Sequence, residues 1–409
     1  MKPFRLFHFD IKTLGNYGDT LLFEAVRQLF HGYNDRGSFR FHGSTNLRDV
    51  VGPKLVSALN ENYDAIVIGG GGLFLSDTNP NERSGWQWNC SLDLLEKIDI
   101  PIIVFAVGNN RFPGQKDFSP KFVEHVNLLA EKSIFFGLRN RGSVETIKEY
   151  LRPELRDKVV YQPCPTTLSS YLFPDIHAAS REPKRELSIQ ALVGKRQTAA
   201  GFDKEAIYDQ CFEALNGLRS KGWNISSFSN ARGDNAFAVD MRETLASDEH
   251  HKLFGSKNIF QALDFFARTP LVVGMRGHAQ MIPFGLGTPI LSLLVHNKLK
   301  YFLDDIGFPE FCVDVRRANF AGELIDKAEY IYENYDAVTS GFERARAGLM
   351  DLSISNLGDI YKALGGRGQK KKFVPMSPFE RYLAQQGYNS QLRLEELKRA
   401  EEVLVREPA

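Results

Sequence analysis

The sequence predicts an α/β protein made of two parallel-sheet domains that face each other across a cleft. Its 409 residues exceed the roughly 100 to 200 of a typical single domain. Short β-branched and aromatic runs alternate with segments of helical periodicity, an order that produces parallel sheets with helices on both faces. The alternation stops once, near the middle of the chain, and then begins again. This interruption indicates two units of similar size.

The first unit is expected to span residues 1–170. Its predicted strands are the apolar runs at residues 4–9, 64–69, 101–107, 133–138 and 158–162. Helical periodicity between these runs predicts helices at residues 20–30 and 121–132. Residues 171–185 have weak periodicity and two prolines, so we assign them to a linker.

The second unit is expected to span residues 186–364, where the same alternation restarts. Its predicted strands are the runs at residues 186–193, 223–228, 270–275, 289–295 and 311–315. Residues 365–409 are predicted to form a basic linker and a helical tail, because residues 390–405 carry the apolar stripe of a helix. Ligands of such sheets bind beyond the carboxyl ends of the strands, so the cleft between the units is the expected site.

Composition excludes several classes of function. The formal net charge is +1, so no global field attracts nucleic acid or an anionic membrane, and any anion site must be built locally. The four cysteines are far apart and form no CxxC pair, which argues against a zinc ribbon, a redox motif or a disulfide scaffold and favours a reducing, cytoplasmic compartment. No segment reads as a membrane span, so membrane contact is expected to be peripheral at most. Neither a metal nor a cofactor is expected.

The first candidate motif is GNYGDT, at residues 15–20, between a predicted strand and a predicted helix. The unpaired backbone N–H groups at a helix start suit an anion or a polar ligand, and glycines permit a tight turn. Asn16, Gly18 and Asp19 are therefore candidate binding residues. In the alternative interpretation, Asp19 is only the N-cap of the helix.

The second candidate motif is IGGGGLF, at residues 68–74. It fails as a dinucleotide fingerprint because Phe74 stands where the third glycine is needed. The glycines Gly70, Gly71 and Gly72 either let the backbone approach a ligand as an anion-binding nest or form a tight strand-to-helix crossover.

The third candidate motif is FFGLRNRGSVETI, at residues 135–147, where Arg139 directly follows a predicted strand. A guanidinium at the carboxyl end of a strand is expected to face the cleft, where its planar fork suits a carboxylate or a phosphate. Ser143 is expected to begin a helix. It is either a ligand contact or, together with Thr146, part of the helix-start chemistry.

The most informative motif lies at residues 271–294, where a predicted strand leads to Arg276 and His278 in a Gly-flanked turn. A helix is expected to start directly after them, so a cation, a titratable imidazole and a helix dipole would converge on one point. A surface arginine with a capping histidine is the alternative. Lys298 follows the next predicted strand, from which its ammonium could reach the same place.

In this order the motifs resemble the polysaccharide pyruvyl transferase family, from about Gly15 to Gly307. The resemblance implies two Rossmann-like domains in the GT-B arrangement, the first on the acceptor side and the second on the donor side. It also implies an enzyme that transfers pyruvate from phosphoenolpyruvate to two hydroxyls of a sugar, forming a ketal and releasing phosphate. The partners would be phosphoenolpyruvate and a sugar or glycan acceptor in cell-surface glycan or exopolysaccharide biosynthesis.

The resemblance also assigns roles to residues. It implies that Arg276, His278 and Asp19 are catalytic, with His278 as the acid or base and Asp19 accepting a proton from the attacking hydroxyl. The positions that it assigns to substrate binding are Arg139, Lys298, Asn16, Gly18, Gly70, Gly71, Gly72 and Ser143.

Three positions depart from the family pattern. Asn140, Cys164 and Gly274 stand where members often have Asp, Asp and Ser or Thr. We expect these changes to affect acceptor choice or the support of the site. Two other readings stay open: a GT-B glycosyltransferase that uses a nucleotide sugar, and a catalytically silent relative that binds an anion or a glycan.

Overall fold

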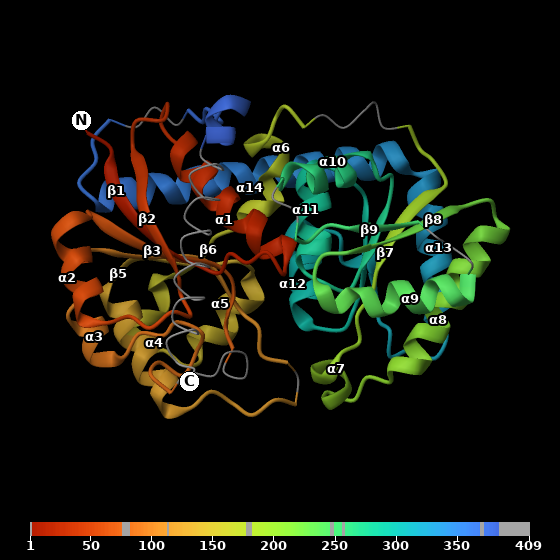
Figure 1. The fold of residues 1–409 in the computed structure, drawn as a ribbon, viewed down its shortest axis with the longest axis horizontal. Coiled ribbons are helices and arrows are strands. Elements are labelled where there is room, and N and C mark those ends of the chain that lie inside the picture. The colour runs from red at the N-terminus through yellow and green to blue at the C-terminus, as the bar shows by residue number, and fades with distance from the viewer. Residues whose placement is uncertain are drawn as a thin grey trace, which may run out of the picture.

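The computed structural model contains two six-stranded parallel sheets, each flanked by helices, that lie side by side (Figure 1). The structure describes residues 2–75, 82–112, 114–176, 182–245, 249–255, 258–368 and 372–383. The predicted α/β class and the two-domain arrangement are confirmed. The helix expected at residues 390–405 lies outside the described residues.

The first sheet has the strand order β2-β1-β3-β4-β5-β6. Its strands are β1 (Phe4–Asp10), β2 (Phe39–Asn46), β3 (Ala65–Phe74), β4 (Ile102–Asn109), β5 (Ser133–Leu138) and β6 (Val159–Tyr161). The helices that accompany it are α1 (Tyr17–Gly32), α2 (Pro53–Asn62), α3 (Leu92–Glu96), α4 (Pro120–Lys132), α5 (Arg141–Lys148) and the 3₁₀ helix η1 (Pro153–Lys158). Along β1, Leu6 packs on one face of the sheet and Phe7 and Phe9 belong to a separate core on the other face, as expected for a strand buried on both sides.

The second sheet has the order β12-β11-β10-β7-β8-β9. Its strands are β7 (Glu186–Gln190), β8 (Asn224–Ser229), β9 (His250–Lys252), β10 (Val272–Gly274), β11 (Ile290–Leu293) and β12 (Cys312–Val313). The helices that accompany it are α7 (Lys195–Ala199), α8 (Lys204–Ser220), η3 (Arg232–Asp234), α9 (Asn235–Leu245), α10 (Phe260–Arg268), α11 (His278–Leu286), α12 (Asn297–Ile306), η4 (Pro309–Phe311) and α13 (Phe320–Glu333).

Two expectations about strands were wrong. The strands β2 and β9 were not predicted, because β2 carries polar residues and a glycine and β9 is the short polar edge strand HHK. The glycine run was expected to follow a strand, but it lies inside β3, where Gly69 pairs with Phe105 and Gly71 with Val107. A Cβ atom at Gly69 would collide with the backbone oxygen of Phe105, so glycine here serves the close approach of two strands.

The long helix α14 (Tyr335–Ala363) connects the two domains (Figure 1). Its first half packs beside the second sheet, where Arg346 donates a hydrogen bond to the Phe284 carbonyl. Its second half reaches the first domain, where the Asn356 amide donates to the Tyr161 carbonyl over 2.9 Å and Tyr361 packs edge-on against Phe4. The chain therefore returns to the first domain after it has completed the second.

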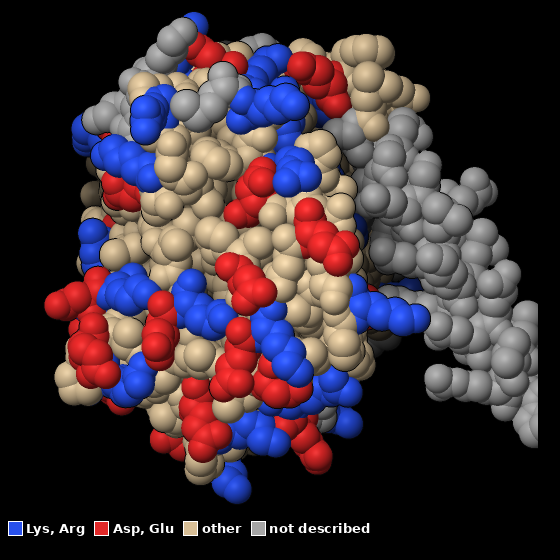
Figure 2. Space-filling view, turned by 90° about the vertical axis from the view of Figure 1, so that its left-hand side faces the viewer, with Lys and Arg blue, Asp and Glu red and all other residues tan. Residues whose placement is uncertain are grey.

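The outer face of the first domain carries acidic and basic side chains that are interspersed (Figure 2). This pattern agrees with the net charge of +1 for the whole chain. No helix among the described residues has both the length and the apolar composition that a membrane span requires.

Helix α11 is the main contact that the second domain makes with the first. It packs against the 3₁₀ helix η2 (Pro165–Leu168) and the short helix α6 (Ser169–Leu172). A Cβ atom at Gly285 of α11 would lie 2.9 Å from the Thr167 carbonyl carbon and would collide with the Thr166 oxygen. The two backbones can approach so closely only because residue 285 is glycine.

We therefore predict that Gly285→Ala lowers the stability of the protein by about 1 to 3 kcal/mol, the usual cost of overpacking. Gly348→Ala is the matched control: it also lies in a helix, but a Cβ atom there would meet open space. Gly348→Ala should raise stability by up to about 1 kcal/mol through helix propensity alone. Thermal unfolding checks both variants, and an unchanged midpoint for Gly285→Ala would contradict the packing argument.

Candidate active site

A cavity of about 580 Å³ lies between the two domains. In each sheet, the strand order reverses at one point: between β1 and β3 in the first and between β7 and β10 in the second. The cavity is lined by segments that follow these strands, including Asn16 and Asp19 after β1, Arg196 after β7, and Arg276 and His278 after β10. Such switch points are where open α/β sheets bind ligands.

The cavity is strongly cationic. Asp19 is the only carboxylate among the described residues that line it. The basic side chains that line it are Arg48, Arg139, Lys195, Arg196, Arg276 and Lys298. This gathering of charge is local, since the chain as a whole is nearly neutral. The cavity is therefore suited to a small ligand with several negative charges.

Arg139 follows β5, and its side chain packs against two glycines, Gly72 of β3 and Gly108 of β4. A Cβ atom at Gly72 would lie 2.9 Å from its Nη2 atom, and one at Gly108 would collide with its Nε atom. The side chain is buried, and its Nε atom has no hydrogen-bond partner in the described structure. Burial lowers the pKa of this guanidinium. An anion in the cavity would supply the partner that the buried cation lacks.

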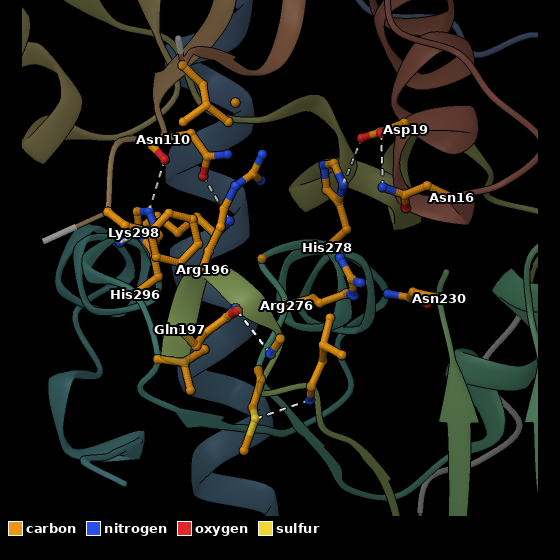
Figure 3. Close-up of a pocket in the computed structure, with 18 of the residues that line it drawn as sticks. Asn16, Asp19, Asn110, Arg196, Gln197, Asn230, Arg276, His278, His296 and Lys298 are labelled. Atoms are coloured by element: carbon orange, nitrogen blue, oxygen red, sulfur yellow. Dashed lines mark hydrogen bonds and ion pairs between the residues drawn. The ribbon is translucent and has the colours of Figure 1, made fainter. Parts of the chain in front are cut away.

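Arg276 is positioned by hydrogen bonds at both its ends. Its backbone N–H donates to the Gln190 side chain over 3.1 Å, and its Nε donates to Asp234 over 2.6 Å. Asp234 is buried and also accepts from the backbone N–H groups of Asn230 and Ala231. The carboxylate is thereby fixed, and it holds the guanidinium at the cavity wall (Figure 3).

Lys298 links the two domains at the opposite side of the cavity (Figure 3). Its Nζ donates to the side chain of Asn110, from the first domain, over 2.9 Å. His296 caps helix α12 by accepting from the Lys298 backbone N–H over 3.0 Å. Burial and the nearby guanidinium groups of Arg139 and Arg276 lower the pKa of Lys298 to about 7.

His278 and Asp19 face each other across the domain boundary, with 3.9 Å between Nδ1 and a carboxylate oxygen (Figure 3). Burial, reinforced by Arg139, Lys298 and Arg276, lowers the pKa of His278 to about 3. Burial raises the pKa of Asp19 to about 6, although the surrounding cations oppose this rise. At neutral pH the imidazole is therefore neutral and the carboxylate is mostly ionised.

The start of helix α1 supports this pair. Asn16 is the N-cap, since its side chain accepts from the Gly18 N–H over 3.1 Å, so the alternative of Asp19 as the cap is wrong. The Asn16 amide also donates to Asp19 over 2.9 Å. Gly18 does not line the cavity, but a Cβ atom there would collide with the His278 imidazole. Gly18 thus provides the space that His278 occupies.

Three other predicted residues lie away from the cavity wall. Gly70 and Gly71 are buried inside β3, and only Gly72 of the glycine run lines the cavity. Ser143 is buried in the first turn of α5, where its hydroxyl accepts from the Asn109 N–H over 3.0 Å. The N-cap of α5 is Asn140, so the Ser143 hydroxyl does not cap the helix and instead ties its first turn to the end of β4.

The positions that depart from the family pattern have structural roles near the site. Asn140 is the N-cap of α5 and accepts from the Ser143 N–H over 2.6 Å. The Cys164 thiol lies 3.9 Å from the His278 Nε2 atom. A Cβ atom at Gly274 would lie 2.7 Å from the Gln280 amide nitrogen, so a serine or threonine would require that side chain to move.

Several cavity residues were missed by the sequence analysis. Arg48 follows β2, which was not predicted as a strand. Lys195 and Arg196 follow β7 in the short helix α7, whose five residues give too little periodicity for a prediction. Lys195 and Arg196 could have been found by applying to the strand predicted at residues 186–193 the rule used for Arg139 and Arg276, whereas Arg48 could not, because no strand was predicted before it. Among the described residues, no cluster of three His, Cys, Asp or Glu side chains could hold a metal ion.

The fold resembles solved structures of the GT-B class of glycosyltransferases and epimerases. A putative UDP-N-acetylglucosamine 2-epimerase from Listeria monocytogenes shares 12% identity and a TM-score of 0.56, over 91% of this chain and 100% of that one. A glycosyltransferase from Rickettsia africae shares 10% identity and a TM-score of 0.54, over 90% and 100% of the two chains. MnaA from S. aureus, solved with UDP, shares 12% identity and a TM-score of 0.52, over 84% and 91%.

The family of this protein is shown by its sequence. A family model described as polysaccharide pyruvyl transferase matches residues 16–297, which is more than half of the chain. The protein therefore belongs to the polysaccharide pyruvyl transferase family. The matched region includes the start of α1, the glycine run, Arg139, Arg276 and His278, and it ends one residue before Lys298.

Proposed function

We propose that this protein transfers pyruvate from phosphoenolpyruvate to two hydroxyls of a sugar, forming a cyclic ketal. One observation carries the proposal: Arg139, Arg276 and Lys298 converge on one cavity with His278 and Asp19. Phosphoenolpyruvate combines a phosphate and a carboxylate on a very small frame. Such a donor needs several fixed cations, and charge-assisted hydrogen bonds contribute about 1.5 to 3 kcal/mol each.

Two domains contribute to the proposed donor site. Arg139 comes from the first domain, and Arg276 and Lys298 come from the second. The donor would therefore bind at the boundary and draw the domains together. The buried guanidinium of Arg139 would gain an anionic partner, and the repulsion among the three cations would be relieved.

The chemistry requires one proton to be moved to the donor and two to be taken from the sugar. The methylene carbon accepts a proton and becomes a methyl group, so the adjacent carbon becomes electrophilic. One sugar hydroxyl attacks that carbon, the phosphate leaves with the oxygen that joined it to the donor, and the second hydroxyl closes the ring. One of the two hydroxyl protons replaces the proton given to carbon, and the other leaves with phosphate, so the overall balance closes.

His278 and Asp19 are the proposed proton-transfer groups. Before the donor binds, neighbouring cations help to keep His278 neutral. A bound phosphate dianion lies among those same cations and reverses the effect, so the pKa of His278 rises in the donor complex. The imidazolium then supplies the proton to the methylene carbon. Asp19, 3.9 Å away, accepts the proton of the attacking hydroxyl.

The test is incubation with phosphoenolpyruvate and a panel of sugars. We expect release of inorganic phosphate and a mass gain of pyruvate minus water in one acceptor. His278→Gln should lower turnover by about 10² to 10⁴ while it retains donor affinity, the usual scale for a lost proton-transfer group. The exposed His42→Gln is the matched control and should behave as the wild type. Sugar transfer from a nucleotide sugar, with no phosphate released from phosphoenolpyruvate, would refute the proposal.

Arg276→Lys tests the donor clamp. In Arg276, the Nε atom bonds Asp234, and the other two nitrogens of the planar guanidinium remain for the ligand. Lysine keeps the positive charge but has only one nitrogen, which cannot do both. Calorimetry should show phosphoenolpyruvate binding about 10- to 100-fold more weakly, the loss of about one charge-assisted hydrogen bond. Arg268→Lys is the control, because Arg268 bonds Asp264 through the same Nε atom on an exposed helix surface. Equal donor affinity in Arg276→Lys and the wild type would exclude the clamp.

The pH dependence of donor binding follows from two groups. Lys298 must be protonated to bind phosphoenolpyruvate, so donor affinity should fall as pH rises through about 7. His278 gains its proton in the donor complex and adds to the same fall. Calorimetry across this pH range should therefore show a shallower fall in affinity for Lys298→Arg than for the wild type. An equal fall in both proteins would exclude Lys298 as a contributor.

A further inference from the structure

The cavity contains three cations that the proposed donor site does not use. Arg48 comes from the first domain, after β2, and Lys195 and Arg196 come from the second domain, in α7 after β7. Both domains therefore add positive charge to the same space. The outer face of the first domain, by contrast, has acidic and basic groups interspersed (Figure 2).

Arg48 is held by an uncharged partner. Its Nε and Nη2 atoms donate to the Gln87 side-chain oxygen over 2.9 and 2.6 Å. Gln87 is buried, and its amide nitrogen donates in turn to the Gly72 carbonyl over 3.0 Å. The guanidinium is therefore oriented without being neutralised, in contrast to Arg276, which is paired with Asp234.

Helix α7 presents the other two cations. Gly194 begins the turn, where its N–H donates to the Gln197 side chain over 3.1 Å. Arg196 is half-buried and lies near the centre of the cavity in Figure 3, and its charge contributes to the lowered pKa of Lys298. Lys195 is exposed at the cavity edge.

The cavity has more basic groups than the proposed donor clamp uses. Six basic side chains line it. A bound phosphoenolpyruvate carries about three negative charges, roughly two on the phosphate and one on the carboxylate, and Arg139, Arg276 and Lys298 are assigned to them. Arg48, Lys195 and Arg196 lie outside that clamp. The volume of about 580 Å³ also has room for a second ligand beside so small a donor.

We propose that Arg48, Lys195 and Arg196 form a second anion subsite, which binds a negatively charged group of the acceptor sugar. This inference rests on the proposed function, since it assigns the other three cations to the donor. The group is a carboxylate, as in a uronic acid, or a phosphate ester, because guanidinium groups bind both. The acceptor is thus an anionic glycan, and the subsite distinguishes it from neutral sugars.

The test measures sugar binding to the full-length protein saturated with phosphoenolpyruvate. Calorimetry compares glucose, glucuronate and glucose 6-phosphate as probes. At least one anionic sugar should bind about tenfold or more tightly than glucose, and the tighter of the two identifies carboxylate or phosphate as the preferred group. Arg48→Gln and Lys195→Gln/Arg196→Gln should each reduce this preference at least about fivefold. Arg268→Gln, which removes an exposed cation from helix α10, should leave it unchanged.

Three outcomes would overturn the subsite: equal affinity for the three sugars, a preference that survives in both variants, or displacement of phosphoenolpyruvate by the anionic sugars. The third outcome would mean that the cavity has one anion site. Failure of the proposed function looks different, because phosphoenolpyruvate itself would then not bind. In that case the same titrations without donor still decide whether Arg48 and Arg196 recognise an anionic sugar.

Discussion

The close packing of helix α11 against the first domain is the contact on which the candidate site depends. This helix begins at His278 and therefore carries the imidazole to the boundary. Two glycines make the approach possible, Gly285 against the backbone of η2 and Gly18 against the imidazole. Neither glycine needs to contact a ligand. Each is required because a methyl group would separate the two halves of the site.

The second constraint is electrostatic. Arg139 is buried and Lys298 is partly buried, and desolvation disfavours the charged form of both, as their lowered pKa values show. Asp19 offsets part of this cost for both groups, and Asp234, on the other side of the domain boundary, pairs with Arg276. A bound anion would relieve the rest of this electrostatic cost. Incompletely compensated cations gathered in one cavity favour the binding of an anion.

Much of this arrangement could be predicted from the sequence, and the reasons for the failures are specific. Arg139 and Arg276 were found because each follows an apolar run that reads clearly as a strand. Arg48 was missed because the strand before it, β2, is polar and interrupted by Gly43. The glycine run was misread because glycines occur both at the ends of strands and, less often, inside them. Only the pairing of Gly69 and Gly71 with β4 shows that these glycines lie inside a strand. The pairing of His278 with Asp19 joins residues far apart in the chain, so spacing alone carries no information about it.

Helix α14 gives the molecule a mechanical property. The chain passes between the domains once between Leu172 and Glu186 and a second time within this helix. Because α14 is a continuous helix of 29 residues, it is stiff over its whole length. Arg346 ties it to the second domain and Asn356 ties it to the first. A change in the angle between the domains would therefore have to bend this helix or break one of these two sets of contacts, which makes α14 a splint across the boundary.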